Sequence, residues 1–510
     1  MIINVLEYLE DSERKFRDKI VFSDESKSLT YTEVLLKAKA LGSSVIEKVP
    51  GSVRKPVVVF VDRKIDCLLS FLGVAYSGNF YVPLDSQMPK SNIELILNTL
   101  EPVAVIAIMS DLDFIKVNVS PGLPIILFEE SMNHEINEAA LFKIRRDSID
   151  TDPLYATFTS GSTGKPKGVV TNHKSVIDLT EQLVDTFHFD NQSVFGNQNP
   201  FYFDASIKDI YCTIKCGATM HVIPKRCFTF PSQLLEFLNY RQINTILWSA
   251  AAIAHVVNTN TFEKEKPAYL QKIMFSGEVM HNKNLNYWRR AMPDAMYVNL
   301  YGPTEITSVC SYYVVNKAFT DDEILPIGIP FRNTEILILN EQNKQVSGDE
   351  IGEICVRGSC LAMGYYNNPE KTSDAFCQNP LNTSYPEIIY RTGDLARYDD
   401  ERQIIFLSRK DNQVKHMGHR VELGDIEILI NSLEFVDTSV CFYDHEKQKI
   451  VLIFKGGNAD KKYILDSVKE RLPKYMYPNI IIKQEELPYN LNGKIDRALL
   501  KSMYRNGKIA

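Results

Sequence analysis

The chain is organised around the segment Tyr155-Ala-Thr-Phe-Thr-Ser-Gly-Ser-Thr-Gly-Lys-Pro-Lys-Gly-Val-Val170. A β-type run enters a loop of small hydroxyl residues and glycines, and a second apolar run follows. Glycines let backbone N–H groups approach a phosphate chain, hydroxyls add donors and lysines add charge. A flexible surface loop is the alternative, but such loops rarely combine four hydroxyls, three glycines and two lysines in ten residues. The residues that we expect to bind polyphosphate are Thr159, Ser160, Gly161, Ser162, Thr163, Gly164, Lys165 and Lys167.

This segment is not a Walker loop, which requires the pattern G-x-x-x-x-G-K-[ST]. Here Gly161 and Gly164 have two residues between them, and Lys165 is followed by Pro166. A different nucleotide-binding architecture must therefore contain it.

Bulk composition excludes several classes of protein. The formal net charge of −7 argues against a broad nucleic-acid surface or an anionic-membrane surface. The nine cysteines form no C-x-x-C pair, so we expect reduced thiols. The N-terminus carries acids where a signal peptide carries basic residues, and no apolar run reaches membrane-spanning length. We expect a soluble cytoplasmic protein without a nucleic-acid partner and without membrane insertion.

The pattern of elements predicts an α/β fold with two domains. Up to about residue 300, buried strand patterns such as Lys55–Asp62 alternate with helical patterns such as the amphipathic Ile65–Tyr76. Strands separated by helices of this length indicate βαβ units and a largely parallel sheet. We expect a large N-terminal domain over residues 1–410, which ends in a small β-rich subdomain at about 324–410. A small mobile α+β C-terminal domain follows over 411–510, with a polar linker at 408–412 and a first helix at Val421–Leu433.

Polar side chains gather where two strands are predicted to end. Asn299-Leu-Tyr-Gly-Pro-Thr-Glu305 closes a predicted strand with an amide, an aromatic ring, a hydroxyl and a carboxylate. Such groups can hydrogen-bond a base, stack on it, contact a phosphate and ligate Mg²⁺. In open α/β sheets, ligands lie beyond the carboxyl ends of strands, which makes this placement informative. Tyr390–Ala396 places Asp394 in a predicted tight turn that suits a ribose diol, although either segment alone could be an ordinary turn.

In this order, the segments resemble the motifs of the adenylate-forming superfamily. That family includes acyl-CoA synthetases, luciferases and the amino-acid adenylation domains of nonribosomal peptide synthesis. The resemblance extends over nearly the whole chain. Its further motifs are Ser77–Asp85, Phe203-Asp-Ala-Ser206, Gly352–Gly358, Ser408–Glu427, Leu472–Pro478 and Asn492–Arg497.

The resemblance implies two half-reactions. ATP and Mg²⁺ convert a carboxylate to an acyl-adenylate with release of pyrophosphate, and the acyl group then passes to a thiol. Lys494 matches the family lysine that reaches the substrate carboxylate and the α-phosphate, and a solvated turn lysine is the alternative. Asp411 matches the hinge about which the small domain rotates between the half-reactions.

The same resemblance assigns roles along the ATP site. Residues 159–167 would hold the β- and γ-phosphates, and Lys494, Thr304 and Glu305 would be catalytic. The remaining assignments are adenine stacking by Tyr301, adenine amino-edge binding by Asn299, α-phosphate contact by Thr304, Mg²⁺ binding by Glu305, ribose binding by Asp394 and Arg409, and ATP binding by Gly302.

Asp204 is the residue that indicates an amino-acid substrate. In amino-acid-activating members of the family, the aspartate of F-D-A-S pairs with the α-ammonium group, and each charge would be costly to bury alone. The alternative is that Asp204 caps the helix that begins near Ala205. The predicted side-chain pocket comprises Lys208, Met274, Ser276, Gly277, Leu300, Ser308 and Val309. Lys208 either points at a polar or carboxylate group of the substrate or extends to solvent.

The amino acid and the acceptor remain open. Ser276-Gly-Glu-Val279 resembles the C-G-E-V segment of D-alanine–carrier-protein ligases, but Ala250-Ala-Ala252 departs from their T-P-S segment. D-alanine is thus one candidate. Because 492–497 closes the adenylation domain and nothing follows residue 510, we expect transfer to the phosphopantetheine arm of a separate carrier protein. The alternatives are an acyl- or aryl-CoA ligase that uses free coenzyme A, and a non-catalytic ATP-binding relative.

Overall fold

A computed structural model describes residues 2–109, 112, 114–115, 119, 122–159, 166–259, 261–262, 265–321, 323–410, 413–457, 460–488 and 495–509. The chain forms two compact units. The first unit comprises Met1–Ser86, Leu97–Thr157 and Gly168–Ser408, and the second comprises Gln87–Ile96, Phe158–Lys167 and Arg409–Ala510.

A seven-stranded sheet contains the strands on both sides of the hydroxyl-rich segment. Its order is β18 (Gly364–Tyr365), β8 (Lys167–Asn172), β7 (Pro153–Thr159), β4 (Phe80–Asp85), β3 (Pro56–Val61), β5 (Ala104–Ala107) and β6 (Ile125–Leu127). The pairs β7–β4, β4–β3, β3–β5 and β5–β6 are parallel, whereas β18 runs antiparallel to β8. The expected parallel βαβ arrangement is confirmed here.

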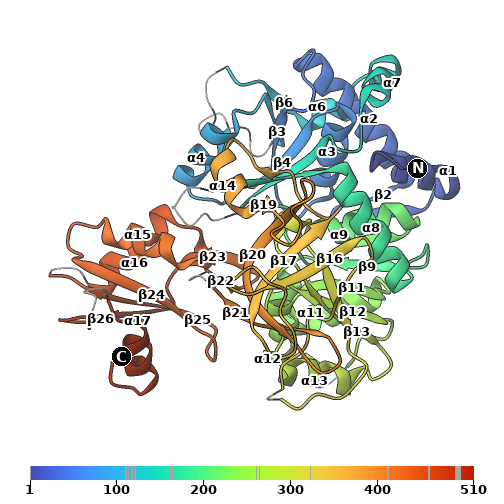
Figure 1. Cartoon of the computed structure of the whole chain (residues 1–510). Helices are drawn as coiled ribbons and strands as arrows, with labels where there is room; N and C mark the ends of the chain where they lie inside the picture. The colour runs from blue at the N-terminus through green and yellow to red at the C-terminus, as the bar shows by residue number, and fades with distance from the viewer. Residues whose placement is uncertain are drawn as a thin grey trace. The chain divides into compact units, whose positions relative to one another are not determined.

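Helix α3 (Ile65–Tyr76) packs on β3 and β4 and on helix α2 (Tyr31–Lys48) (Figure 1). The expectation of an amphipathic helix is wrong. Eleven of its twelve residues are buried, because the sheet covers one side and α2 covers another. The contact with α2 is close: a Cβ atom on Gly73 would lie 2.2 Å from Leu41.

The second large sheet has nine strands, and one of them, β13, leads into the loop of the candidate site. Its order is β15 (Ile329–Pro330), β14 (Ser311–Val314), β13 (Met296–Tyr301), β12 (Lys272–Ser276), β11 (Thr245–Ser249), β9 (Val194–Asn197), β10 (Thr219–Val222), β1 (Ile20–Ser23) and β2 (Ser28–Thr30). The strands from β13 to β1 are parallel, whereas the pairs β13–β14, β14–β15 and β1–β2 are antiparallel. The carboxyl ends of β12 and β13 therefore lie at one edge.

Helices cover these sheets, and capping residues fix several of their first turns. Further helices of the described part between residues 6 and 291 include α1 (Leu6–Phe16), α4 (Lys90–Leu100), α6 (Phe128–Ser131), α7 (Glu138–Asp147), α8 (His173–Phe187), α9 (Ser206–Cys216), α10 (Lys225–Thr229), α11 (Pro231–Tyr240), α12 (Ala250–Asn258) and α13 (Asn282–Ala291). Asn172 caps α8 and Ser249 caps α12 through side-chain oxygens.

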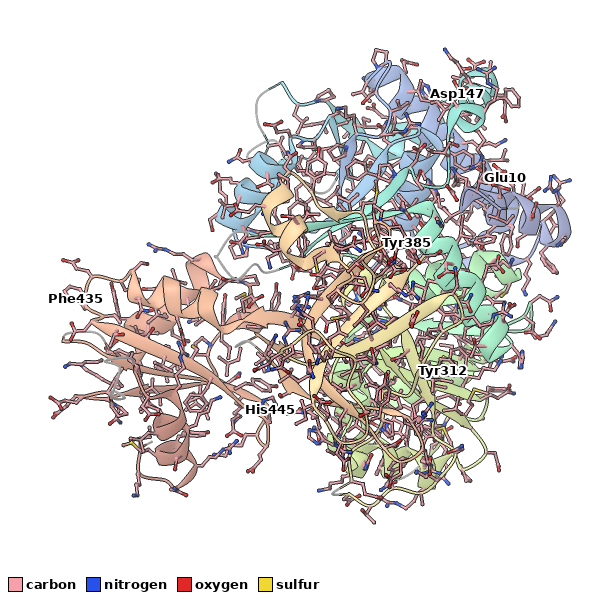
Figure 2. All side chains as sticks on the ribbon, viewed as in Figure 1. Glu10, Asp147, Tyr312, Tyr385, Phe435 and His445 are labelled. Carbon is pink, nitrogen blue, oxygen red and sulfur yellow. The ribbon has the colours of Figure 1, made fainter. Side chains whose placement is uncertain are left out.

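Glu10, labelled in Figure 2, accepts hydrogen bonds from Tyr76 (2.9 Å) and Arg145 (2.8 Å) and so joins α1 to α3 and α7.

The β-rich part of the first unit is an antiparallel sheet. Its order is β16 (Thr334–Leu339), β17 (Gly352–Gly358), β20 (Ile388–Tyr398) and β19 (Phe376–Gln378), and β21 (Ile404–Arg409) pairs with β20. The short helix α14 (Pro369–Ala375) precedes β19. The predicted linker starts inside this sheet, because Ser408 and Arg409 are the last residues of β21. Asp411 and Asn412 lie outside the described residues.

The second unit has an α+β core. Strands β24 (Thr438–Asp444), β25 (Lys449–Lys455) and β26 (Ile480–Lys483) form one sheet, accompanied by α15 (Leu423–Asn431), α16 (Lys461–Arg471) and α17 (Arg497–Arg505). The expected helix at Val421–Leu433 begins two residues late. Val421 instead pairs with Val414 in a hairpin of β22 (Gln413–His416) and β23 (His419–Glu422). Within the described ranges, every helix is too short or too polar to cross a bilayer.

Candidate active site

The loop after β13, Gly302–Val309, is folded tightly onto itself. A Cβ atom on Gly302 would lie 2.5 Å from Val309 Cα and 2.7 Å from the Ser308 carbonyl oxygen, so only glycine fits there. Thr307 and Ser308 have left-handed backbones, with φ of 60° and 77°. The Cys310 N–H closes the loop by donating to the Tyr301 carbonyl at 2.8 Å. Strained non-glycine backbone of this kind concentrates at functional sites.

Glu305 lies in this loop with its carboxylate fully buried. The Tyr365 hydroxyl donates to Glu305 Oε1 at 2.7 Å. The segment 360–362 also fixes the backbone of this loop. The Ala362 N–H donates to the Glu305 carbonyl (2.9 Å), and Thr307 Oγ1 donates to the Cys360 carbonyl (2.8 Å). A carboxylate oxygen with a fixed orientation is a ligand that suits Mg²⁺.

Asp394 lies on a bulge of β20, so the expected tight turn is wrong. Cys355 pairs with Arg391 and Glu353 pairs with Leu395, which leaves residues 392–394 opposite Ile354 alone. The bulge is possible because Gly393 takes a left-handed backbone with φ of 74°.

The hydroxyl of Thr392 stabilises the bulge. Its Oγ1 donates to the Ile354 carbonyl at 2.8 Å and accepts from the Asp394 N–H at 3.0 Å. The Asp394 carboxylate is thereby turned into the protein and is only 4% exposed.

Tyr301 and Asp394 contact each other directly. The Tyr301 hydroxyl donates to Asp394 Oδ2, and the ring centroid lies 6.4 Å from that of Phe406. Burial, followed by the charge of Asp394, raises the pKa of Tyr301 well above its usual value, so this phenol remains a hydrogen-bond donor. On the same strand, Asn299 Nδ2 donates to the Pro326 carbonyl at 2.8 Å. We call Asn299, Tyr301, Glu305 and Asp394, the residues predicted to bind the nucleotide, the nucleotide side of the candidate site.

Asp204 lies at the turn that leads into α9. The N-cap residue of that helix is Ala205, which makes no side-chain capping bond, so the interpretation of Asp204 as the N-cap is wrong. The Asp204 carbonyl accepts from the Ile207 N–H at 3.1 Å, which closes the turn. The Asp204 carboxylate lies near the buried phenol of Tyr155, whose pKa is raised by burial and then by this charge.

Lys208 is buried, which excludes the alternative that it extends to solvent. It is 1% exposed, and its Nζ donates to Ser308 Oγ at 2.8 Å. The next residue, Asp209, accepts from Asn197 Nδ2 at 2.7 Å, and burial raises the pKa of its carboxyl to about 7. We call Asp204, Lys208 and Ser308, which are predicted to bind the amino acid, the amino-acid side of the candidate site.

The other predicted pocket residues lie around this side. Met274, Leu300 and Val309 belong to one buried apolar cluster, which also contains residues of α9. Ser276 ends β12, and Gly277 follows with a left-handed φ of 97°. A Cβ atom on Gly277 would meet no atom of the described residues within 4 Å, apart from its chain neighbours.

Other predicted site residues belong to the second unit or lie outside the described residues. Thr159 ends β7, and its buried Oγ1 has no hydrogen-bond partner among the described residues. Lys167 begins β8 and Arg409 ends β21, and both belong to the second unit, as Thr159 does. Residues 160–165, Asp411 and Lys494 lie outside the described residues.

Two supporting residues were not predicted from the sequence. Tyr365 lies in the two-residue strand β18, and no local pattern around it indicates a partner sixty residues away. Thr392 could have been found, because a hydroxyl residue before Gly393 and Asp394 favours a local side-chain bond to the backbone.

Solved structures that contain adenylation domains have a similar fold. The adenylation domain AlmE of Vibrio cholerae, in complex with glycyl-adenosine-5'-phosphate, superposes with a TM-score of 0.83 at 22% identity over 99% of this chain and 98% of that one. An NRPS protein containing adenylation and PCP domains, PA1221 in its holo form, gives a TM-score of 0.82 at 22% identity over 98% and 84%.

The chain belongs to the AMP-binding enzyme family, whose model matches residues 9–366. The predicted resemblance to adenylate-forming enzymes is thereby confirmed. Gramicidin S synthase 1 of Brevibacillus brevis is 31% identical over 498 residues, which are 96% of this chain and 44% of the synthase. A D-alanine--D-alanyl carrier protein ligase of Bacillus licheniformis is 30% identical over 495 residues, 95% of this chain and 96% of the ligase. The chain thus spans less than half of the synthase and nearly all of the ligase.

Proposed function

We propose that this protein uses ATP to activate an amino acid as an aminoacyl-adenylate, with release of pyrophosphate. It then transfers the aminoacyl group to the phosphopantetheine thiol of a separate carrier protein. The observation that carries the proposal is the loop from Tyr301 to Val309. Its first residue bonds Asp394 of the nucleotide side, and Ser308 bonds Lys208 of the amino-acid side. The two halves of an aminoacyl-adenylate would therefore be bound along one strained loop.

The nucleotide side would bind AMP through groups that are already oriented. Tyr301 would stack on adenine, and Asn299 would accept from its amino group through Oδ1, because Nδ2 already donates to Pro326. Asp394 would accept from the ribose hydroxyls, together with Arg409. Thr304 would donate to the α-phosphate. Preorganised donors of this kind stabilise developing charge without reorganisation during the reaction.

Glu305 would hold Mg²⁺ with one carboxylate oxygen, in the orientation that Tyr365 fixes at 2.7 Å. When bound, the cation supplies positive charge to the phosphates. Residues 159–167 would hold the β- and γ-phosphates through backbone donors and the two lysines. Lys494 would donate to the carboxylate and the α-phosphate as the leaving group departs.

Asp204 would pair with the α-ammonium group of the substrate. A half-buried carboxylate near apolar and phenolic side chains stabilises an opposite charge more strongly than it would in water. The relatives support this choice of substrate: the ligases are named for D-alanine and for a D-alanyl carrier protein, and the solved PA1221 structure contains a PCP domain. We expect the same kind of acceptor here.

Pyrophosphate exchange against D- and L-amino acids and plain carboxylates tests the proposal. We expect exchange with an amino acid, loss of exchange in Asp204→Asn, and transfer to a holo carrier protein in preference to free coenzyme A. Exchange driven by plain carboxylates, with transfer to free coenzyme A, would identify an acyl- or aryl-CoA ligase. ATP binding without exchange on any substrate would identify a non-catalytic relative.

A further inference from the structure

A further buried carboxylate lies beside the bulge that carries Asp394. It belongs to Glu353 on β17, whose backbone pairs with Leu395 of β20 at the edge of the bulge. Glu353 is only 6% exposed. Burial of a carboxylate is costly unless the charge is paired and hydrogen-bonded. The partners of Glu353 therefore show how the sheet keeps this charge.

One oxygen of Glu353 bonds the bulge directly. The Gly393 N–H donates to Glu353 Oε1 at 3.1 Å, and Gly393 immediately precedes Asp394. The next N–H, that of Asp394, donates to Thr392 Oγ1 at 3.0 Å. A bulge interrupts the ladder of hydrogen bonds that fixes the backbone elsewhere in a sheet. The side chains of Glu353 and Thr392 thus fix the peptide groups from which the Asp394 side chain extends.

The other oxygen of Glu353 is held by Arg391. Arg391 Nη1 donates to Glu353 Oε2 at 2.7 Å and supplies the opposite charge. Nη2 of the same guanidinium donates to the side-chain oxygen of Asn343, in the connection between β16 and β17. Charged hydrogen bonds are stronger than neutral ones, and the planar fork of an arginine gives them a fixed direction. The Glu353 carboxylate is therefore oriented toward the Gly393 N–H.

The alternative is that this ion pair only joins the strands of the sheet. Such a pair exists on the neighbouring strand, where Arg357 Nε donates to Glu335 Oε2 at 2.7 Å across β17 and β16. The Glu335 side chain is 50% exposed, whereas that of Glu353 is 7% exposed. A pair that only joins two strands needs neither the cost of burial nor a bond to the backbone of a bulge. Both features of Glu353 favour a role in positioning Asp394.

We propose that Glu353 is a positioning residue that holds the Asp394 carboxylate for the ribose hydroxyls, so that the enzyme selects ATP over its deoxy analogues. This inference rests on the proposed binding of ATP. Asp394 is fixed at two points, because the Tyr301 hydroxyl bonds its carboxylate and Glu353 bonds the peptide before it. A site recognises a hydroxyl group only while the partner of that hydroxyl is held in the right place.

Binding of nucleotides to the wild-type enzyme is the first test. Calorimetry with ATP and with its 2′-deoxy and 3′-deoxy analogues measures recognition of the ribose without requiring turnover. We expect ATP to bind about tenfold or more tightly than at least one analogue, because a hydrogen bond to a charged group is lost. Equal affinities for the three nucleotides overturn the inference. If this preference is present but no amino acid supports pyrophosphate exchange, the proposed function fails and the inference stands.

Glu353→Gln tests the positioning role. The variant keeps the size of the side chain but has one acceptor oxygen, which can serve the Gly393 N–H or Arg391 but not both. We expect the preference for ATP over the deoxy analogue to fall by about three- to tenfold. The preference for ATP over GTP should change by less than about twofold, because Asn299, which we propose binds the base, is held separately by the Pro326 carbonyl. An unchanged ribose preference, or a parallel fall in both preferences, overturns the inference.

Glu335→Gln is the matched control, because it makes the same substitution in a cross-strand ion pair of the same sheet. We expect both preferences to stay at their wild-type values, and an equal loss of ribose preference in this control overturns the inference. If Glu353→Gln does not fold, as judged by thermal melting, Glu353→Asp decides the matter. Aspartate keeps the charge beside Arg391 but is one methylene too short to bond Gly393 as well. An unchanged ribose preference in Glu353→Asp overturns the inference.

Discussion

The nucleotide side and the amino-acid side hold their charges in different ways. On the nucleotide side, two buried carboxylates each accept from a tyrosine hydroxyl, Tyr301 to Asp394 and Tyr365 to Glu305. On the amino-acid side, a buried ammonium donates to the small hydroxyl of Ser308. A tyrosine is rigid and packs tightly, which would suit the nucleotide that we propose binds there. A serine occupies little space beside the lysine, which would leave room for a substrate side chain. The predictions below test this contrast.

Lys494→Ala should have the largest effect, because we propose that this lysine contacts both the carboxylate of the amino acid and the α-phosphate of ATP. We expect pyrophosphate exchange to fall by about 10²–10³-fold for every amino acid, since one preorganised donor to developing charge is lost. ATP binding, measured by calorimetry, should be mostly retained. Exchange close to the wild-type rate would contradict the assignment.

Asp204→Asn affects the amino-acid side alone. Without its carboxylate the substrate ammonium group is left uncompensated, and we expect kcat/KM for the amino acid to fall by about 10²-fold. The KM for ATP should stay within about twofold, because no nucleotide contact is altered. Equal losses in kcat/KM for the amino acid and for ATP would mean that Asp204 does not act on the amino-acid side alone.

Tyr365→Phe affects the nucleotide side alone. Removal of the hydroxyl that orients Glu305 should weaken the affinity for Mg²⁺ by about 10- to 100-fold, seen as a higher magnesium concentration at half-maximal exchange. Tyr366→Phe is the matched control, because it removes the hydroxyl of the neighbouring tyrosine. An unchanged magnesium dependence in Tyr365→Phe would argue against Glu305 as the metal ligand.

Asp411→Pro should leave adenylation, the first half-reaction, close to the wild-type rate. Proline fixes φ, so a hinge at this residue could no longer rotate freely. We expect transfer to the carrier thiol to fall by about tenfold while pyrophosphate exchange stays near wild type. The two rates are measured on the same preparation, and a parallel loss in both would count against a hinge.

Asp209→Asn should have the smallest effect on adenylation. It should instead change how the free energy of unfolding depends on pH. The folded-state pKa of Asp209 is raised to about 7 from an ordinary value of 3.8. The folded protein therefore holds a proton that the unfolded chain releases between these values, and wild-type stability falls as pH rises through that window. The slope is on the order of 1 kcal/mol per pH unit at most. Melting temperatures from pH 4 to 8 should show a flatter profile for the variant, and parallel profiles would contradict the assignment.

The regular elements of the first unit were largely predictable, because they depend on local pattern. Strand β3 (Pro56–Val61) lies within the expected Lys55–Asp62 and helix α3 has the expected bounds, Ile65–Tyr76, since a short apolar run marks the strand and a longer run of helical length marks the helix. The hairpin that contains Val421 was missed because a short strand followed at once by a helix resembles one longer helix. The bulge at Asp394 depends on pairing with β17, which no local pattern reveals.

The candidate site was predictable in its residue types but not in its contacts. Asp204, Glu305 and Asp394 stand out as carboxylates near expected strand or helix ends. The burial of Lys208 could not be predicted, because it depends on a loop one hundred residues later that is itself held by Gly302. The orientation of Glu305 depends in the same way on Tyr365.

Strand β18 is joined by backbone hydrogen bonds to strand β8, which follows the segment that we propose binds polyphosphate. Tyr365 pairs with Val169, the Met363 N–H donates to the Val170 carbonyl, and the Tyr366 N–H donates to the Gly168 carbonyl. The strand that holds Glu305 is thus bonded to the residues directly after the hydroxyl-rich segment. Thermodynamic linkage makes any such coupling reciprocal. A divalent cation at Glu305 and a polyphosphate chain at residues 159–167 would then each raise the affinity for the other by the same factor.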